Sequence, residues 1–212
     1  HDMRNDLQLV LAYSEMLEDA VPADKQGYLE TVVESARHAV ELTTTARDMS
    51  DVLLDEGDGP GQARLRPALE TELDKLRSTY TDAEITVDGG MPDVTVRGND
   101  LLNSVFRNLL KNAIQHNDKD VPAVTVSVRA DDESVTVRVA DNGPGVPDQQ
   151  KDEIFGKGEK GLESAGTGIG LYLVQTLVSS YGGEITVGDN EPDGAVFAVT
   201  LPRADGSTET DD

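Results

Sequence analysis

Hydrophobic positions recur at three- and four-residue intervals over the first 54 residues, a pattern that predicts two amphipathic helices. The first helix is expected over residues 1 to about 20 and ends at Pro22. Asp24 is the candidate N-cap of a second helix, whose apolar stripe continues to Leu53. A hairpin of two such helices leaves its stripe uncovered, so we expect two copies to form a homodimeric four-helix bundle.

The pattern changes after a short acidic, glycine-rich segment, which reads as a linker over residues 55–63. The alternation beyond it predicts helices over 67–79, 99–116 and 169–181, and strands over 85–87, 94–96, 123–130, 134–140, 184–187 and 195–201. We therefore expect an α+β fold in which helices cover one face of a mixed sheet. The predicted domains are a hairpin over 1–54, a second domain over 64–202 and a disordered polar tail over 203–212.

Charge and composition exclude several classes of function. The chain has 18 Lys and Arg against 41 Asp and Glu, a net charge of −23, which argues against nucleic acid and against anionic lipid as partners. Without cysteine it has no disulfide, no thiolate metal site and no cysteine nucleophile. An ordinary acidic cytoplasmic protein is one interpretation of the charge. The other is adaptation to molar salt, a respect in which the chain resembles haloarchaeal proteins.

The chain has no run of eighteen consecutive apolar residues, so we expect no membrane span in this segment. It begins with His1 and no signal-peptide pattern follows, so we expect a piece of a longer protein. The expected location is the cytoplasm, with no membrane contact by this segment. Anchorage of the intact protein through an upstream segment stays open.

Two glycine-rich runs are candidate phosphate sites. Asp141–Gly145 (DNGPG) follows a predicted strand, and Gly166–Leu171 (GTGIGL) opens a predicted helix, where backbone N–H groups and the helix dipole favour an anion. Neither run is a dinucleotide fingerprint or a P-loop. Taken alone, each could be a turn without a ligand.

The helix between these runs carries polar residues on one face. Asn108, Asn112 and His116 are spaced four apart, so they lie on one side of the helix. Amide oxygens are hard ligands of the kind that Mg²⁺ accepts. The alternative is that both amides are ordinary solvated surface groups.

Five segments in order together resemble the sequence motifs of sensor histidine kinases. Residues 108–117 are similar to the N box, 141–145 to the G1 box, 154–158 to the F box and 166–171 to the G2 box. His1–Asn5 (HDMRN) resembles the H box of the phosphoacceptor hairpin. The resemblance implies a dimerisation and phosphotransfer hairpin followed by an ATP-binding catalytic domain of the GHKL (Bergerat) fold, an α/β sandwich.

The resemblance also implies the nucleotide site. Asn112 would bind Mg²⁺, Asn108 would support the triphosphate, and Asp141 would accept a hydrogen bond from the adenine amino group. Residues 155–165 would form the ATP lid, whose lysines either contact phosphate or are solvated charges. The full set of ATP-binding residues so implied is Asn108, Asn112, His116, Asp141, Gly143, Gly145, Phe155, Lys157, Lys160, Gly166, Thr167, Gly168, Gly170 and Leu171.

In the hairpin, the resemblance assigns His1 as the phosphoryl acceptor. A neutral imidazole is a nucleophile able to attack the γ-phosphorus of ATP in line. Asp2 would orient or deprotonate the ring, and Asn5 would position water for hydrolysis of a phospho-aspartate. The implied partner is the receiver domain of a response regulator, and the implied cofactors are ATP and Mg²⁺. A histidine that stands first by accident of where the chain begins is the alternative for His1.

Two other functions stay open. One is a catalytically degenerate, dimeric ATP-binding signalling module. The other is a different GHKL ATPase, such as a chaperone-like protein, a mismatch-repair protein or an anti-sigma serine kinase. These ATPases resemble the second domain alone and lack the hairpin that carries His1, so residues 1–54 argue against them.

Overall fold

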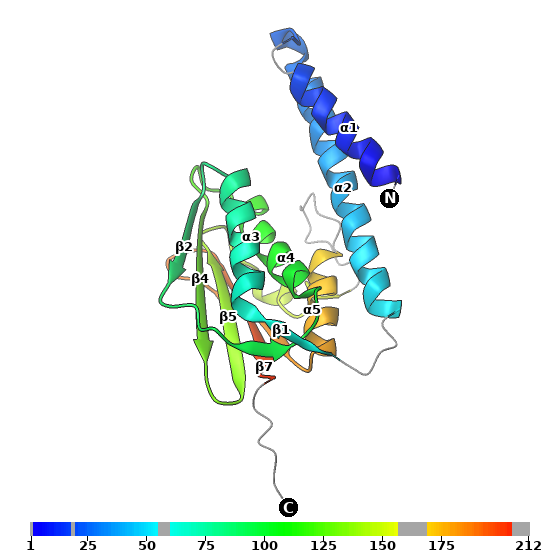
Figure 1. Ribbon diagram of the computed structural model, residues 1–212. Coiled ribbons are helices and arrows are strands. Elements are labelled where there is room, and N and C mark those ends of the chain that lie inside the picture. The colour runs from blue at the N-terminus through cyan, green and yellow to red at the C-terminus, as the bar shows by residue number, and fades with distance from the viewer. Residues whose placement is uncertain (1, 18–19, 55–59, 157–168, 205–212) are drawn as a thin grey trace, which may run out of the picture. The chain divides into compact units, whose positions relative to one another are not determined.

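The computed structural model describes residues 2–17, 20–54, 60–156 and 169–204, and the chain divides into two compact units, His1–Leu54 and Asp55–Asp212 (Figure 1). The first unit is the predicted helical hairpin. Helix α1 spans Asp2–Leu17, the 3₁₀ turn η1 spans Ala23–Lys25 and helix α2 spans Gln26–Leu54.

The predicted N-cap at Asp24 is wrong. Pro22, at φ −57° and ψ 146°, is the residue that flanks η1, and no side chain caps this turn. Since the chain is already helical at Asp24, its carboxylate is not in the flanking position from which a cap accepts the first free N–H groups.

The hairpin buries only part of its apolar surface. Ser14 on α1 and Ala36 on α2 are buried, and Leu7 and Leu11 are half-buried on the same side of α1 as Ser14. A second group of large apolar side chains is exposed on both helices: Leu9, Val10, Tyr13, Met16, Leu17, Tyr28 and Val32. These residues are uncovered within one chain, as expected for a hairpin that pairs with another surface.

The second unit is built on a five-stranded mixed sheet of order β2-β4-β5-β7-β6. Strands β2 and β4 are parallel, and each of the other neighbouring pairs is antiparallel. The five strands are β2 Glu84–Asp88, β4 Ala123–Ala130, β5 Ser134–Asp141, β6 Glu184–Asp189 and β7 Ala195–Pro202.

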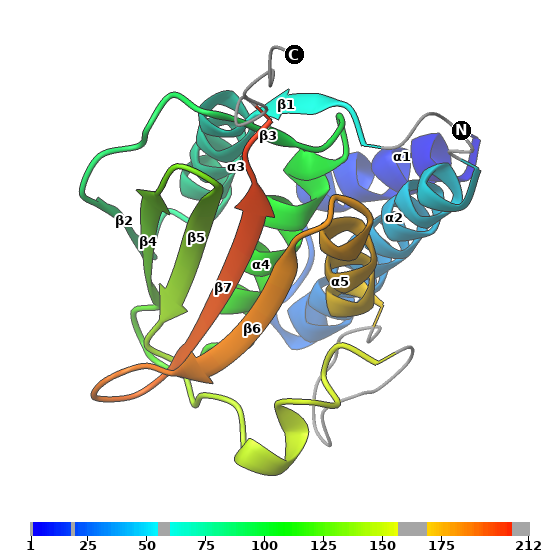
Figure 2. The same ribbon diagram turned by 90° about the horizontal axis from the view of Figure 1, so that it is seen from below.

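Three helices lie on one face of this sheet (Figures 1 and 2). They are α3 Leu65–Thr79, α4 Leu102–Gln115 and α5 Gly170–Ser180, and α4 packs against both α3 and α5. Phe106, Leu109 and Leu110 of α4 have no exposed surface, and α4 contacts β4 and β5 of the sheet as well as the two neighbouring helices. The predicted α+β architecture is confirmed.

Alternation along β5 decides where Asp141 lies. Val135, Val137 and Val139 are buried, whereas the residues at the alternate positions are half-buried (Ser134, Thr136 and Ala140) or exposed (Arg138). Successive side chains of a strand point to opposite faces. Asp141 continues the valine series, so its carboxylate lies on the helix-covered face at the end of the strand.

A small second sheet was not predicted in full. Strand β1, Gln62–Arg64, pairs antiparallel with β3, Thr95–Arg97, so the last two residues of the segment predicted as linker form a strand. The predicted start of the polar tail at residue 203 is also too early, because Arg203 forms a β-bridge with Val96 and donates its N–H to the Glu133 carbonyl. Both segments are too short for hydrophobic alternation to reveal.

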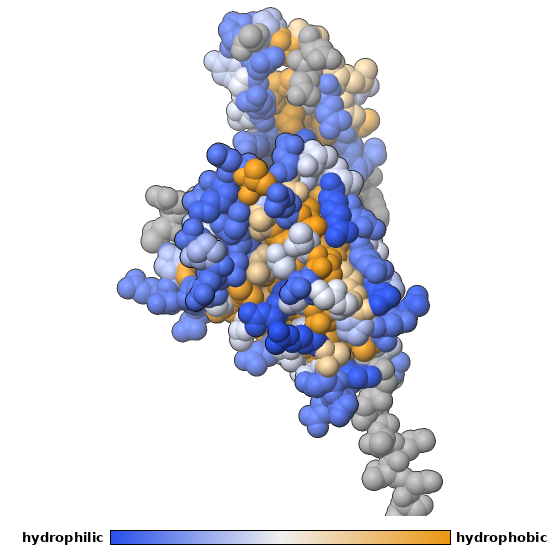
Figure 3. Space-filling model, turned by 90° about the vertical axis from the view of Figure 1, so that its left-hand side faces the viewer, coloured by the Kyte–Doolittle hydropathy of each residue, from blue (hydrophilic) through white to orange (hydrophobic). Residues whose placement is uncertain are grey.

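On the face of the molecule in Figure 3, hydrophilic side chains flank a hydrophobic region near the middle of the view. Within residues 2–17, 20–54, 60–156 and 169–204, no helix is both long enough and apolar enough to cross a membrane.

Candidate functional site

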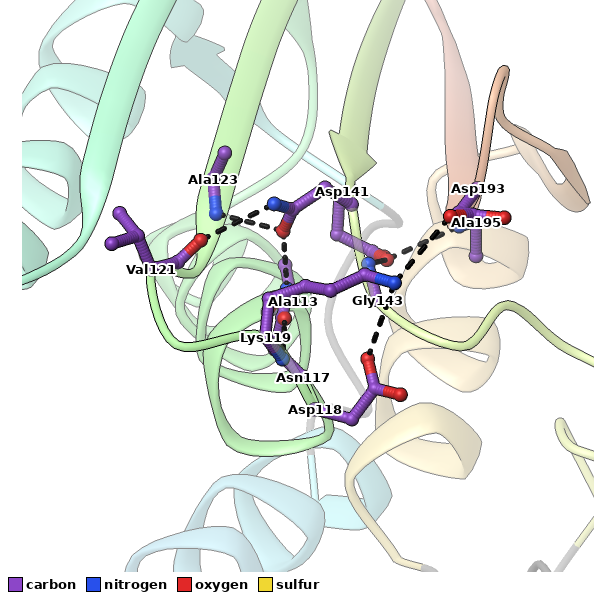
Figure 4. A network of polar contacts seen from close by, with 11 residues as sticks. Ala113, Asn117, Asp118, Lys119, Val121, Ala123, Asp141, Gly143, Asp193 and Ala195 are labelled. Atoms are coloured by element: carbon purple, nitrogen blue, oxygen red, sulfur yellow. Dashed lines mark hydrogen bonds and ion pairs between the residues drawn. The ribbon is translucent and has the colours of Figure 1, made fainter.

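Asp141 is the buried carboxylate at the centre of the candidate site. It ends β5 with 8% of its surface exposed, and its Oδ1 accepts hydrogen bonds from two backbone N–H groups. Gly143 N–H lies 2.9 Å away, in the turn that follows β5, and Ala195 N–H lies 3.1 Å away, at the start of β7 (Figure 4). Both donors bind the same oxygen, and within the described residues no donor reaches Oδ2, which is left to accept from a ligand.

Glycine is required at two positions around this carboxylate. Gly194 has a φ of +115°, and a Cβ there would overlap the Asp141 carbonyl oxygen. Gly145 has a φ of +75°, and its Cβ would lie 3.0 Å from the Gly194 carbonyl oxygen. The turns before β7 and after β5 therefore approach each other at backbone distance, as only glycine allows.

Burial raises the pKa of Asp141, and the N–H groups of Gly143 and Ala195 oppose that shift. A carboxyl group with a folded pKa above its unfolded pKa binds its proton more tightly in the folded protein. The stability it contributes is therefore present below the unfolded pKa and is lost as the pH rises through the folded pKa.

From the raised pKa of Asp141 we predict how the melting temperature of a variant without this carboxylate depends on pH. The melting temperature of Asp141→Asn, minus that of the wild type, should increase between about pH 3 and about pH 7, because the variant keeps no buried charge. Calorimetry across this range measures the difference. A difference that does not change with pH would contradict a raised pKa for Asp141.

An amide network holds the neighbouring turn (Figure 4). Oδ1 of Asn142 accepts from the Asn117 side chain and from the Ala123 N–H, both at 2.8 Å, and its amide group donates to the Val121 carbonyl at 3.2 Å. Asn117 in turn donates to the Ala113 carbonyl of α4. The end of β5, the start of β4 and the end of α4 are thus joined through two side-chain amides.

The polar face of α4 runs from the interior to the solvent. Asn108 is 8% exposed and donates to the Ser104 carbonyl at 2.7 Å, Asn112 is half-buried, and His116 at the C-terminal end of α4 is exposed. A Cβ at Gly170, the first residue of α5, would lie 2.8 Å from Oδ1 of Asn108. This close approach joins the predicted N box to the last glycine of the predicted G2 box.

Among the described residues no cluster of three His, Asp or Glu side chains could hold a metal ion. The hard ligand that α4 offers is the half-buried Asn112 amide oxygen. Since Mg²⁺ usually takes one or two protein ligands together with water and phosphate oxygens, this arrangement suits a Mg²⁺ that arrives with a nucleotide.

The segment after the G1 box lies along the β6–β7 hairpin. Phe155 is 7% exposed and packs edge-on against Phe197 of β7, with ring centroids 6.4 Å apart. Lys151, at the end of the 3₁₀ turn η2 (Asp148–Gln150), forms ion pairs with Asp148 and Asp189. Hydrogen bonds to these carboxylates, Asp148 first, raise the pKa of Lys151.

Several predicted site residues lie outside the described residues: His1, Lys157, Lys160, Gly166, Thr167 and Gly168. Leu171 lies half-buried in the first turn of α5. In the hairpin, Asp2 and Asn5 lie in the first two turns of α1, and Asn5 is exposed. The structure thus brings together Asp141 with Gly143, and Asn108 with Gly170.

Sequence reasoning missed four residues around Asp141: Asn142, Asn190, Gly194 and Ala195. Asn190 donates to the Asp141 carbonyl at 2.7 Å, and the other three act through the contacts given above. Gly194, the one glycine of the turn before β7, was the available signal, because a lone glycine between two predicted strands often marks a close backbone approach.

Fold and site together define the class of protein. The family model of the histidine kinase-, DNA gyrase B- and HSP90-like ATPases matches residues 98–205, which include α4, Asp141 and the start of α5. The chain belongs to this ATPase family, and its resemblance to sensor histidine kinases is confirmed.

Individual relatives extend the similarity over the hairpin. The chain is 27% identical to the sensor protein KdpD of Escherichia coli K12 over 96% of its own length and 23% of that protein. It is also 27% identical to the signal transduction histidine-protein kinase BaeS of the same strain, over 95% of this chain and 45% of BaeS. The chain therefore spans less than half the length of these two relatives.

Solved structures agree on the fold. The mycobacterial sensor histidine kinase MprB matches with a TM-score of 0.62 and 24% identity over 68% of this chain and 98% of that chain. Full-length ShkA, solved in complex with AMPPNP, matches with a TM-score of 0.65 and 25% identity over 96% of this chain and 44% of ShkA.

Proposed function

We propose that this chain is the catalytic core of a two-component sensor histidine kinase, which binds Mg-ATP and transfers the γ-phosphoryl group to His1. The observation that carries the proposal is Asp141, a buried carboxylate oriented by two backbone N–H groups and leaving Oδ2 to accept from a ligand. Membership of a family of ATPases supports ATP as that ligand. The exocyclic amino group on the adenine ring of ATP would be the hydrogen-bond donor to Oδ2 of Asp141.

The neighbouring residues are proposed to serve the triphosphate. Asn112 would contribute an amide oxygen to a Mg²⁺ that the phosphate oxygens also hold, and the bound Mg²⁺ would spread the charge that develops on transfer. The buried Asn108, which approaches the first turn of α5, would set the position of that helix N-terminus. Backbone N–H groups there would receive phosphate, as proposed for the glycines of residues 166–170.

In the proposed transfer, the neutral imidazole of His1 attacks the γ-phosphorus. A nitrogen–phosphorus bond forms, the bond to the oxygen bridging to the β-phosphate breaks, and ADP leaves with that oxygen. The ring proton passes to Asp2 or to water. The phosphoryl group then moves to an aspartate of a response regulator, and Asn5 would serve any hydrolysis of that phospho-aspartate.

The exposed apolar residues of the hairpin support a homodimer as the working form. Tyr13 and Met16 of α1 are 63% and 76% exposed, and Tyr28 of α2 is 76% exposed. A second hairpin laid against these residues would complete a four-helix bundle. The net charge of −23 opposes the association of two such chains, so we expect dimerisation to strengthen as salt rises.

His1→Gln tests the proposal. With Mg²⁺ and γ-labelled ATP, the wild type should acquire label that is lost in acid and kept in base, and His1→Gln should acquire none, because the nucleophilic nitrogen is gone. His38→Gln, which removes an exposed histidine of α2, is the matched control and should label as the wild type does. Label that persists in His1→Gln would refute the assignment of His1.

A further inference from the structure

The side chain of Lys151 is placed differently from an ordinary surface lysine. Its Nζ lies 2.8 and 2.9 Å from the two carboxylate oxygens of Asp189 and 2.6 Å from the Asp148 carboxylate, while only 17% of the side chain is exposed. Acidic residues outnumber basic ones by more than two to one, so a lysine near carboxylates is expected by chance. Chance does not explain why Lys151, with a mostly buried side chain, contacts both carboxylate oxygens of Asp189.

Asp189 is connected to Asp141 of the proposed nucleotide site through its pairing partner and through the residue that follows it. It is the last residue of β6 and pairs with Ala195, the first residue of β7, whose N–H donates to Oδ1 of Asp141. The next residue, Asn190, donates its side-chain amide to the Asp141 carbonyl at 2.7 Å and its backbone N–H to the Gly194 carbonyl at 2.9 Å. The turn between β6 and β7 (residues 189–195) therefore holds Asp141 by two hydrogen bonds.

The ion pairs of Lys151 lie between two other contacts that residues 145–155 make with the β6–β7 hairpin. On one side, Gly145 approaches the Gly194 carbonyl closely, and on the other, Phe155 packs against Phe197. Residues 145–155 thus follow the β6–β7 hairpin at three points. The middle point alone depends on charge.

We propose that Lys151 is a positioning residue for nucleotide binding: by fixing Asp189 it holds the β6–β7 turn in the arrangement that orients Asp141. This inference rests on the proposed function, since it assigns Lys151 a part in the same ATP site. Lys151 does not itself contact the nucleotide in this scheme.

Substitution of Lys151 tests the proposal. Lys151→Gln should raise the KM for ATP about threefold and leave kcat within about twofold, because a partly exposed ion pair contributes modestly and acts here on binding. Lys151→Arg should restore the wild-type KM. The double variant Lys151→Asp with Asp189→Lys should recover more of the affinity than either single variant does.

Arg77→Gln is the matched control. Arg77 forms an exposed ion pair with Asp74 on α3 at 3.4 Å, so this variant removes the same charge and an ion pair that takes no part in the hydrogen bonds around Asp141. It should leave the KM for ATP unchanged. A purely structural role for Lys151 would lower the melting temperature without a change in KM, and that result would overturn the proposal.

Hydrogen exchange separates this inference from the proposed function. The amide of Ala195 should exchange faster in Lys151→Gln than in the wild type, with no nucleotide present. Unchanged exchange at Ala195 would overturn the inference whatever the protein binds. A wild-type chain that binds no ATP, together with faster exchange in the variant, would instead refute the proposed function.

Discussion

Asp141→Asn should lower the affinity for ATP about 100-fold, because the charge-assisted hydrogen bond that we propose between Asp141 and the adenine amino group would be replaced by two donors that face each other. The asparagine oxygen would take over the two bonds from Gly143 and Ala195, since these N–H groups fix which atom lies there. The amide NH₂ would then occupy the position of Oδ2 and oppose the adenine amino group. Titration calorimetry with ATP measures the loss.

The same variant should keep its stability at neutral pH. Burial raises the pKa of Asp141, so ionisation of this carboxylate opposes folding, and its removal takes away that opposition. Loss of binding combined with retained stability is typical of a residue kept for function. A variant that binds ATP as tightly as the wild type would contradict the assignment of Asp141 to the base.

Asp131→Asn is the matched control for this substitution. Asp131 also accepts two backbone N–H groups, from Glu133 and Ser134, but it lies exposed in the β4–β5 turn. Hydrogen bonds from Glu133 first, then Ser134, lower its pKa, so the stability it contributes is present at neutral pH and is lost as the pH falls. Asp131→Asn should therefore lower stability slightly at pH 7 and leave ATP affinity unchanged.

Gly194→Ala should lower the free energy of unfolding by about 3 kcal/mol, since strain and overlap add at this position. The new Cβ would overlap the Asp141 carbonyl oxygen, a backbone atom that cannot move without displacing the end of β5. The φ of +115° adds to this cost, because residues with a side chain rarely adopt that backbone conformation. Urea denaturation measures the stability, and the surviving folded fraction should bind ATP more weakly.

Substitutions of two other glycines separate the cost of the positive φ from the cost of steric overlap. Gly89 has a φ of +81° and open space around it, so Gly89→Ala should cost only about 1 kcal/mol, the cost of the backbone conformation alone. Gly188 in β6 has open space and no positive φ, so Gly188→Ala should change stability by less than about 0.5 kcal/mol. If Gly194→Ala proved as mild as Gly89→Ala, the close approach to Asp141 would be refuted.

Elements with a clear period were predicted well from the sequence. The strand predicted over 123–130 matches β4 at both ends, because Val124, Val126 and Val128 alternate with polar residues. Helix α4 was predicted three residues too early and one too late, since its amphipathic pattern does not mark where its hydrogen bonding begins. The three-residue strands β1 and β3 pair with each other across about thirty residues, a relation that no local pattern carries.

The site divides in the same way. Asp141, Asn108 and the glycine runs belong to local motifs and could be selected from the sequence. Ala195 and Asn190 carry no motif, because they act through backbone and amide bonds that form only in the folded sheet. The pairing of β5 with β7 brings residue 195 beside residue 141, and the turn after β6 brings Asn190 there. Lys151 was hidden for the same reason, since its partner Asp189 is 38 residues away.

The mapped position of the phosphoryl group is the most direct test of the account. The chain has three histidines, His1, His38 and His116, so mass spectrometry of peptides from the chain after reaction with Mg-ATP can distinguish them. We predict phosphohistidine at His1 and at neither of the others, with phosphorylation of Asp141→Asn about tenfold slower at an ATP concentration about ten times the wild-type Kd. Phosphate on His38 or His116, or an unmodified His1 in a chain that binds ATP, would contradict it.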